Sequence, residues 1–182
     1  MKTTIMTFLL AVCSIPASAQ LPSGTNPPAV NPPVQQKIPN SWFSKAKGFE
    51  KALELQKETG ADIFVVFTRE SPPNEKGLCQ WFDSKGLNAQ KVREFLRGYI
   101  KVSVPLPSNP DTQKMATDFD VRKCPAVFIV QPNGKRYYCK VFEYPDGHPK
   151  VFPPETLIEL FRARSSERYQ NTQPPAPSTS SE

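Results

Sequence analysis

The residues of this chain that could do redox chemistry are cysteines, at positions 13, 79, 124 and 139. Cys124 directly precedes Pro125, which opens the apolar run 126–130. Proline cannot donate a ladder hydrogen bond, so it must open the strand or sit in a special turn, and it is a candidate for a cis peptide bond. Cys79 lies upstream, at a predicted junction between a strand and a helix. Cys79 and Cys124 are therefore the candidate reactive sulfurs.

The first residues are typical of a secretory signal. Met1-Lys2 is followed by the apolar run 5–12, then Pro16 and the small residues Ala17-Ser18-Ala19. We expect a signal peptide over 1–19, cleaved after Ala19, and a periplasmic or secreted protein. The alternative is a lipoprotein anchored through Cys13, although valine beside this cysteine fits that motif poorly. No later segment is apolar enough to predict a membrane helix.

Composition excludes several function classes. Removing the signal leaves three cysteines, too few for a disulfide-built scaffold, and the odd number leaves at least one thiol free or paired between molecules. A single histidine argues against an ordinary zinc site, and neither a metal nor a cofactor is expected. The chain has 23 Lys and Arg against 17 Asp and Glu. These charges are scattered, so nucleic-acid binding is not expected.

The mature chain divides into a folded middle and two polar ends. Residues 20–40 are rich in proline and predict a linker, and residues 165–182 predict a disordered tail rich in proline and serine. Residues 41–164 are long enough for one compact domain.

Within this domain, predicted helices and strands alternate. In chain order we expect a helix over 42–59, a strand over 61–67, a helix from about 79, a helical stretch over 88–97, a strand over 99–104, a helix from 109 or 111 to 119, a hairpin of strands 126–131 and 136–143, and a helix from 154. This order predicts an α/β fold, in which a mixed β-sheet with a parallel pair is flanked by helices on both faces.

Several motifs in this order carry a family resemblance. They are a leading Trp42, a strand ending in Phe67-Thr68, the segment Gly77-Leu78-Cys79, the segment Phe119-Asp120-Val121-Arg122, Pro125 at a strand start, and the turn Asn133-Gly134-Lys135. Residues 42–163 resemble the secreted thioredoxin-like domain family. The resemblance implies the thioredoxin-like fold and a groove that receives an extended peptide or the thiols and disulfides of exported proteins.

The redox motif of that family is degenerate here. The family has two cysteines separated by two residues at the helix start. Aligning Cys79 with the second cysteine places Lys76 where the first should be, so the attacking residue is missing. The resemblance also implies that Cys124, before the predicted cis-Pro125, lies near Cys79. The two could form a redox pair, or an inert disulfide, or stay as separate buried thiols.

Other residues could complete the predicted site. Lys76 could lower the pKa of Cys79, or could be an ordinary exposed lysine. Trp81 could border the substrate groove, and Pro125 would shape it. Cys139 fits a small core residue better than a reactive thiol. We therefore expect thiol–disulfide exchange on exported partners through Cys79 and Cys124, with a non-catalytic binding module as the alternative.

Overall fold

The computed structural model describes residues 38–107 and 109–170. Its strands are β1 (Trp42–Ser44), β2 (Ile63–Arg69), β3 (Ile100–Leu106), β4 (Ala126–Val130), β5 (Arg136–Cys139), β6 (Phe142–Glu143) and β7 (Lys150–Val151). Its α-helices are α1 (Lys45–Thr59), α2 (Pro73–Trp81), α3 (Gln90–Phe95), α4 (Pro110–Asp118), α5 (Pro154–Arg164) and α6 (Glu167–Gln170). The short helices are η1 (Phe82–Leu87), η2 (Leu96–Gly98) and η3 (Pro145–Gly147).

Five strands form one mixed sheet in the order β1-β3-β2-β4-β5, and β6 pairs with β7 separately. β3 runs parallel to both β1 and β2, whereas β4 is antiparallel to β2 and to β5. The predicted parallel pair and the closing hairpin are therefore both confirmed.

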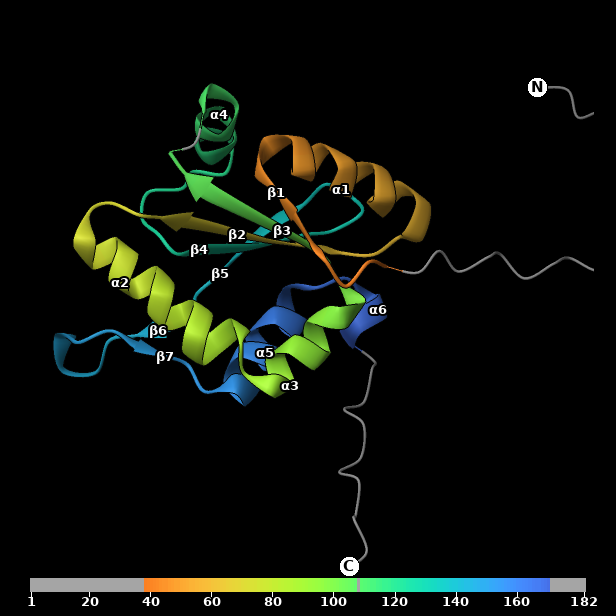
Figure 1. Ribbon diagram of the computed structural model, residues 1–182. Helices are drawn as coiled ribbons and strands as arrows, with labels where there is room; N and C mark the ends of the chain where they lie inside the picture. The colour runs from red at the N-terminus through yellow and green to blue at the C-terminus, as the bar shows by residue number, and fades with distance from the viewer. Residues whose placement is uncertain (1–37, 108, 171–182) are drawn as a thin grey trace, which may run out of the picture. The chain divides into compact units, whose positions relative to one another are not determined.

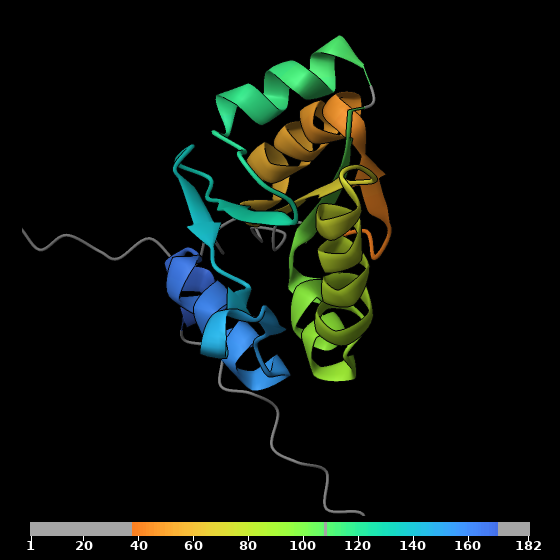
Figure 2. The ribbon, with the colours of Figure 1, turned by 90° about the vertical axis from the view of Figure 1, so that its left-hand side faces the viewer.

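Both faces of the sheet are covered, as the continuous apolar run in β2 predicts. Ile63, Val65 and Phe67 face one core cluster, which includes residues of α1 and α4. Phe64 and Val66 face the other, which includes residues of α3, α5 and α6. Figures 1 and 2 show α1 and α4 on one side of the sheet, with α3 and α5 on the opposite side. The predicted α/β architecture is confirmed.

Most element boundaries differ from the sequence prediction by a few residues, and three elements differ more strongly. The predicted helix over 42–59 begins instead with a short strand, β1, which pairs with β3 through Phe43 and Val102. The helix expected from about Cys79 begins at Pro73, because a proline is well suited to the first helical position. The predicted strand over 136–143 is divided into β5 and β6.

The folded domain also extends past both predicted boundaries. Asn40, in the predicted linker, accepts a hydrogen bond from the side chain of Lys101. Tyr169, in the predicted tail, is buried, stacks on Tyr99 and donates from its hydroxyl to the carbonyl of Gly98. The predicted signal peptide, most of the linker and the end of the tail lie outside the described residues.

Candidate functional site

The loop before β4 has the backbone geometry that the sequence predicts. The Cys124–Pro125 peptide bond is cis, which confirms that expectation. Both residues are buried, so Pro125 offers little surface to a partner. The backbone N–H of Cys124 points to the first turn of α2, where the carboxylate of Glu75 accepts it at 2.9 Å.

Helix α2 places the sequence-predicted site residues differently from the expectation. Because α2 begins at Pro73, Cys79 lies in the last turn of the helix rather than at its start. Lys76 is exposed and forms an ion pair with Glu70 at 2.9 Å. The positive end of the helix dipole therefore cannot stabilise a Cys79 thiolate, since this effect falls off within the first turn. The expectation that Cys79 sits at the helix start is wrong.

Glu75 immediately precedes Lys76, the residue that the family resemblance aligns with the first cysteine. It lies in the first turn of α2 and faces Cys124. Its Oε2 atom also forms an ion pair with Arg69 at 3.0 Å, and its side chain is 13% exposed. A carboxylate held by a guanidinium and a backbone N–H is well satisfied, so Glu75 anchors the loop before the cis bond to α2.

Cys79 and Cys124 share one core cluster, and both are free thiols. Their exposed fractions are 7% and 2%. The backbone N–H of Arg69, at the end of β2, donates to the sulfur of Cys79 at 3.4 Å. The structure therefore brings the two predicted cysteines into the same region, around the carboxylate of Glu75.

The surroundings of both thiols disfavour the thiolate. Burial raises the pKa of Cys79, and the carboxylates of Glu75 and Glu70 raise it further, against the lowering effect of the Arg69 N–H. Burial raises the pKa of Cys124 to about 12, against a lowering effect of the Arg69 charge and with smaller raising contributions from Cys79 and Glu75. The attacking species in disulfide exchange is the thiolate, so neither cysteine is activated as a nucleophile.

A cleft of about 450 Å³ opens beside Cys79. Its apolar lining includes Val66, Phe82 and Cys79, and its polar lining includes Thr68 and Glu70 at the end of β2. We call it the α2 cleft.

The three residues predicted to form a substrate groove do not line this cleft. Trp81 is 37% exposed and packs against Phe142 at a ring distance of 6.2 Å. Pro125 is buried, and Lys76 pairs with Glu70, a residue that lines the cleft.

The remaining cysteine is a core residue. Cys139 is 2% exposed in β5, and burial raises the pKa of its thiol to about 12. Among residues 38–107 and 109–170, no group of three or more His, Cys, Asp or Glu side chains could hold a metal ion. In the same part of the chain no helix has the length and apolarity needed to cross a membrane.

Glu75 and, apart from Cys79, the residues that line the α2 cleft were not predicted as site residues. The signal for Glu75 was present, since Pro72 and Pro73 with a glutamate two residues later are typical of a helix start. No comparable local signal marks Val66 or Phe82, because their side chains meet only after the strand and the helix pack together.

Comparisons with known proteins identify the fold. No family model and no curated protein matches the chain. Among solved structures, the oxidised DsbD C-terminal domain of Neisseria meningitidis is similar at a TM-score of 0.51 and 15% identity, covering 68% of this chain and 99% of the domain.

Two further structures are similar. A DsbH oxidoreductase has a TM-score of 0.51 and 15% identity, covering 78% of this chain and 94% of its own. A thioredoxin from Thermus thermophilus has a TM-score of 0.45 and 20% identity, and the match covers 68% of this chain and 87% of the thioredoxin. The two structures with a TM-score of 0.51, at 15% identity, establish the fold alone. The chain has the thioredoxin fold, with a carboxylate and no cysteine in the first turn of α2.

Proposed function

We propose that this chain is a non-catalytic thioredoxin-fold module that binds an extended segment of an exported protein. The observation that supports the proposal is the first turn of α2, where Glu75 faces Cys124 and no sulfur is present. A catalytic thiol has to be accessible and to have a lowered pKa. Cys79 and Cys124 are buried, and the pKa of each is raised.

The α2 cleft is the surface that we assign to the partner. It lies at the carboxyl end of β2, where Thr68 and Glu70 meet the apolar side chains of Val66 and Phe82. In open α/β sheets, ligands bind outside the carboxyl ends of the strands. An apolar lining with a few polar groups is the usual composition of a binding site.

A substitution at the mouth of this cleft tests the assignment. Peptides selected for binding to the intact chain should lose most of their affinity when Thr68→Arg introduces a long side chain there. Lys51→Gln, on the exposed face of α1, is the matched control and should not change the affinity. Equal affinities for the two variants would place the peptide elsewhere and contradict the assignment.

Thiol–disulfide exchange through Cys79 and Cys124 is the second candidate. The observation that favours it is proximity, because Cys79 and Cys124 share one core cluster beside the Cys124–Pro125 cis bond. In such a reaction two protein thiols are oxidised to one disulfide. The partner's disulfide is reduced to two thiols and receives the two electrons and two protons.

A disulfide-reduction assay separates the two candidates. The chain is incubated with insulin and a dithiol reductant, and its thiols are counted by mass after alkylation. We expect insulin to be reduced no faster with the chain present than with the reductant alone, whether or not Cys79 and Cys124 form a stable disulfide. Turnover that is lost in Cys124→Ser and kept in Cys139→Ser would overturn the binding-module proposal and establish exchange.

The proposal includes export. We expect cleavage after Ala19, so that the mature protein begins at Gln20 and works in the periplasm or outside the cell. An intact mass of the protein recovered from that compartment tests this expectation. A mass that includes acyl chains on Cys13 would replace cleavage after Ala19 with a lipid anchor.

A further inference from the structure

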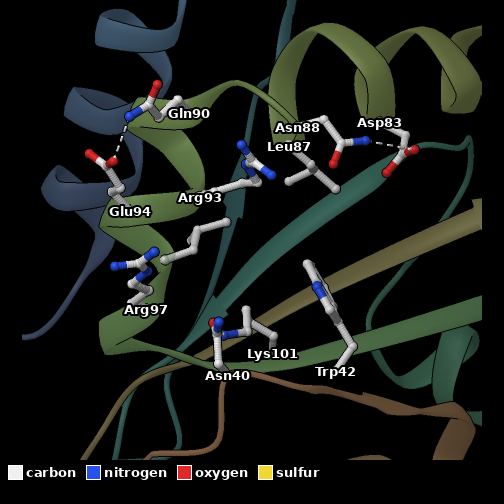
Figure 3. A pocket seen from close by; sticks show the side chains of 11 residues that line it. Asn40, Trp42, Asp83, Leu87, Asn88, Gln90, Arg93, Glu94, Arg97 and Lys101 are labelled. Carbon is white, nitrogen blue, oxygen red and sulfur yellow. Dashed lines mark hydrogen bonds between the residues drawn. The ribbon is translucent and has the colours of Figure 1, made fainter.

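A second cleft, of about 400 Å³, lies between α3 and the β1–β3 edge of the sheet. We call it the basic cleft, because Arg93, Arg97 and Lys101 line it. Figure 3 shows the two arginines on the helix side, with Lys101 and Trp42 on the strand side. The basic cleft shares Trp42, Asp83 and Leu87 with the α2 cleft, but its three cations do not line the α2 cleft.

Lys101 is the unusual residue of this cleft. In the sheet it lies beside Trp42 of β1 and Phe64 of β2, so the three side chains share one face. The residue is only 4% exposed, and its ammonium donates to Oδ1 of Asn40 at 3.1 Å. No carboxylate among the described residues forms an ion pair with it. A buried charge without a counter-ion is costly, which favours a bound anion.

Two guanidinium groups reinforce the positive charge. Arg93 and Arg97 are four residues apart, so they project from one side of the helical segment formed by α3 and η2. Both are exposed, and neither side chain has an ion-pair or hydrogen-bond partner in the part of the chain that the structure describes. Burial lowers the pKa of Lys101, and the charge of Arg97 lowers it further.

The two acidic residues of the cleft have other partners. Asp83 accepts a hydrogen bond from the side-chain amide of Asn88 at 3.2 Å, and Glu94 accepts one from Gln90 at 2.9 Å. Figure 3 shows these two pairs away from Lys101. The three cations therefore remain available to a ligand.

Trp42 supplies an aromatic wall. Its ring is in edge contact with Phe64, with the centroids 6.2 Å apart, and the residue is 41% exposed. A flat group that lies against such a ring gains both buried area and stacking. The cleft volume falls within the range of small-molecule sites, roughly 300–1,000 Å³.

We infer that the basic cleft binds a small organic anion, with a carboxylate or phosphate group held by Lys101, Arg93 and Arg97 and a flat group stacked on Trp42. Guanidinium groups suit this task, since their planar donor geometry matches carboxylate and phosphate oxygens. The amide of Asn40 already orients the ammonium of Lys101.

The test is a separate titration of the full chain with each of four compounds: phenyl phosphate, benzoate, phenol and inorganic phosphate. Binding is monitored through the NMR chemical shifts of the backbone amides. We expect phenyl phosphate, benzoate or both to shift amides around residues 93–101 and to bind more weakly as salt increases. Binding of phenyl phosphate alone identifies a phosphate ester, and binding of benzoate alone identifies a carboxylate. Phenol should not bind, and inorganic phosphate should bind more weakly than phenyl phosphate.

Matched variants make the result specific. Arg97→Gln and Lys101→Met should each weaken binding by roughly tenfold or more, because each removes a charged hydrogen-bond donor. Arg97 is exposed, so its variant should fold even if Lys101→Met does not. Lys51→Gln, on α1, is the control. Equal affinities of Arg97→Gln and Lys51→Gln, no binding of either aromatic anion, or equal binding of phosphate and phenyl phosphate would overturn the inference.

Discussion

The carboxylate of Glu75 accepts a hydrogen bond at 2.9 Å from the backbone N–H of Cys124, the residue before the Cys124–Pro125 cis bond. The same oxygen pairs with Arg69 at the end of β2. One side chain thus connects α2, β2 and the loop before β4. Since this N–H is already used, an extended partner cannot take it as a backbone hydrogen-bond donor.

The stability of this connection gives the first prediction. Glu75→Ala should lower the free energy of unfolding by about 1–3 kcal/mol, because the buried N–H of Cys124 loses its acceptor. Glu75→Gln keeps an acceptor and should cost less. The measurement is urea unfolding followed by circular dichroism. Glu70→Gln, which removes an exposed ion pair with Lys76, should change stability by less than about 1 kcal/mol. An equally small effect of Glu75→Ala would contradict the anchoring role.

The order of thiol labelling gives the second prediction. Cys79 lines the α2 cleft, whereas Cys124 and Cys139 do not, so limiting iodoacetamide should modify Cys79 first in the reduced native protein. The labelling rate of an ordinary thiol, with a pKa of about 8.5, levels off once the pH is well above that value. Because the pKa of Cys79 is raised, the labelling rate of Cys79 should still increase at that pH. Peptide mapping by mass identifies the modified residue.

Cys79→Ser is the control and should lack the early product. Early modification of Cys124, or a rate that levels off near neutral pH, would show that burial does not suppress the thiolates as the structure indicates.

The sequence predicted the architecture well because it depends on patterns that are local. The apolar run of β2, the turn Asn133-Gly134 and the capping residue Asn109 each specify one element with little help from the rest of the chain. The cis bond at Pro125 was also predicted, since a proline at the start of a buried strand allows few alternatives.

The candidate site was predicted only in part. Cys79 and Cys124 were expected to lie close together, and they share a core cluster. The predicted helix start lies too late, because the polar residues before Cys79 and Gly77 are also typical of a loop. β1 and the basic cleft depend on pairing between distant segments, such as Trp42 with Lys101, which no local pattern reveals.

Two glycines of the α2–η1 segment give the third prediction. A Cβ added to Gly86 would lie 2.8 Å from two ring atoms of Phe82, whereas one added to Gly77 would meet nothing within 4 Å. Gly86→Ala should therefore destabilise the protein by about 1–3 kcal/mol through overpacking. Gly77→Ala should stabilise it by about 0.5–1 kcal/mol, because alanine is the better helix former. Thermal unfolding of both variants measures the difference, and a stabilising Gly86→Ala would contradict the packing of η1.

The buried carboxyl of Asp62 gives the last prediction. Asp62 is fully buried before β2, where its Oδ2 atom accepts the backbone N–H of Ser166 at 2.7 Å. Its Oδ1 atom has no hydrogen-bond partner in the part of the chain that the structure describes. Burial raises the pKa of Asp62, against smaller lowering effects from Ser166 and Arg168. The folded state therefore binds this proton more tightly than the unfolded chain.

The difference between the folded and unfolded pKa of Asp62 sets how the free energy of unfolding changes with pH. The stabilisation from the protonated carboxyl is fully present below the unfolded pKa of about 3.9 and is lost as the pH rises through the raised folded pKa. Asp62→Asn cannot titrate, and its side-chain oxygen can still accept the Ser166 N–H. The free energy of unfolding of the unaltered protein, measured relative to Asp62→Asn, should therefore decrease as pH rises across this window. Asp111→Asn, on the exposed start of α4, controls for the loss of one carboxylate. A difference that stays constant or increases with pH would show that the Ser166 hydrogen bond outweighs burial.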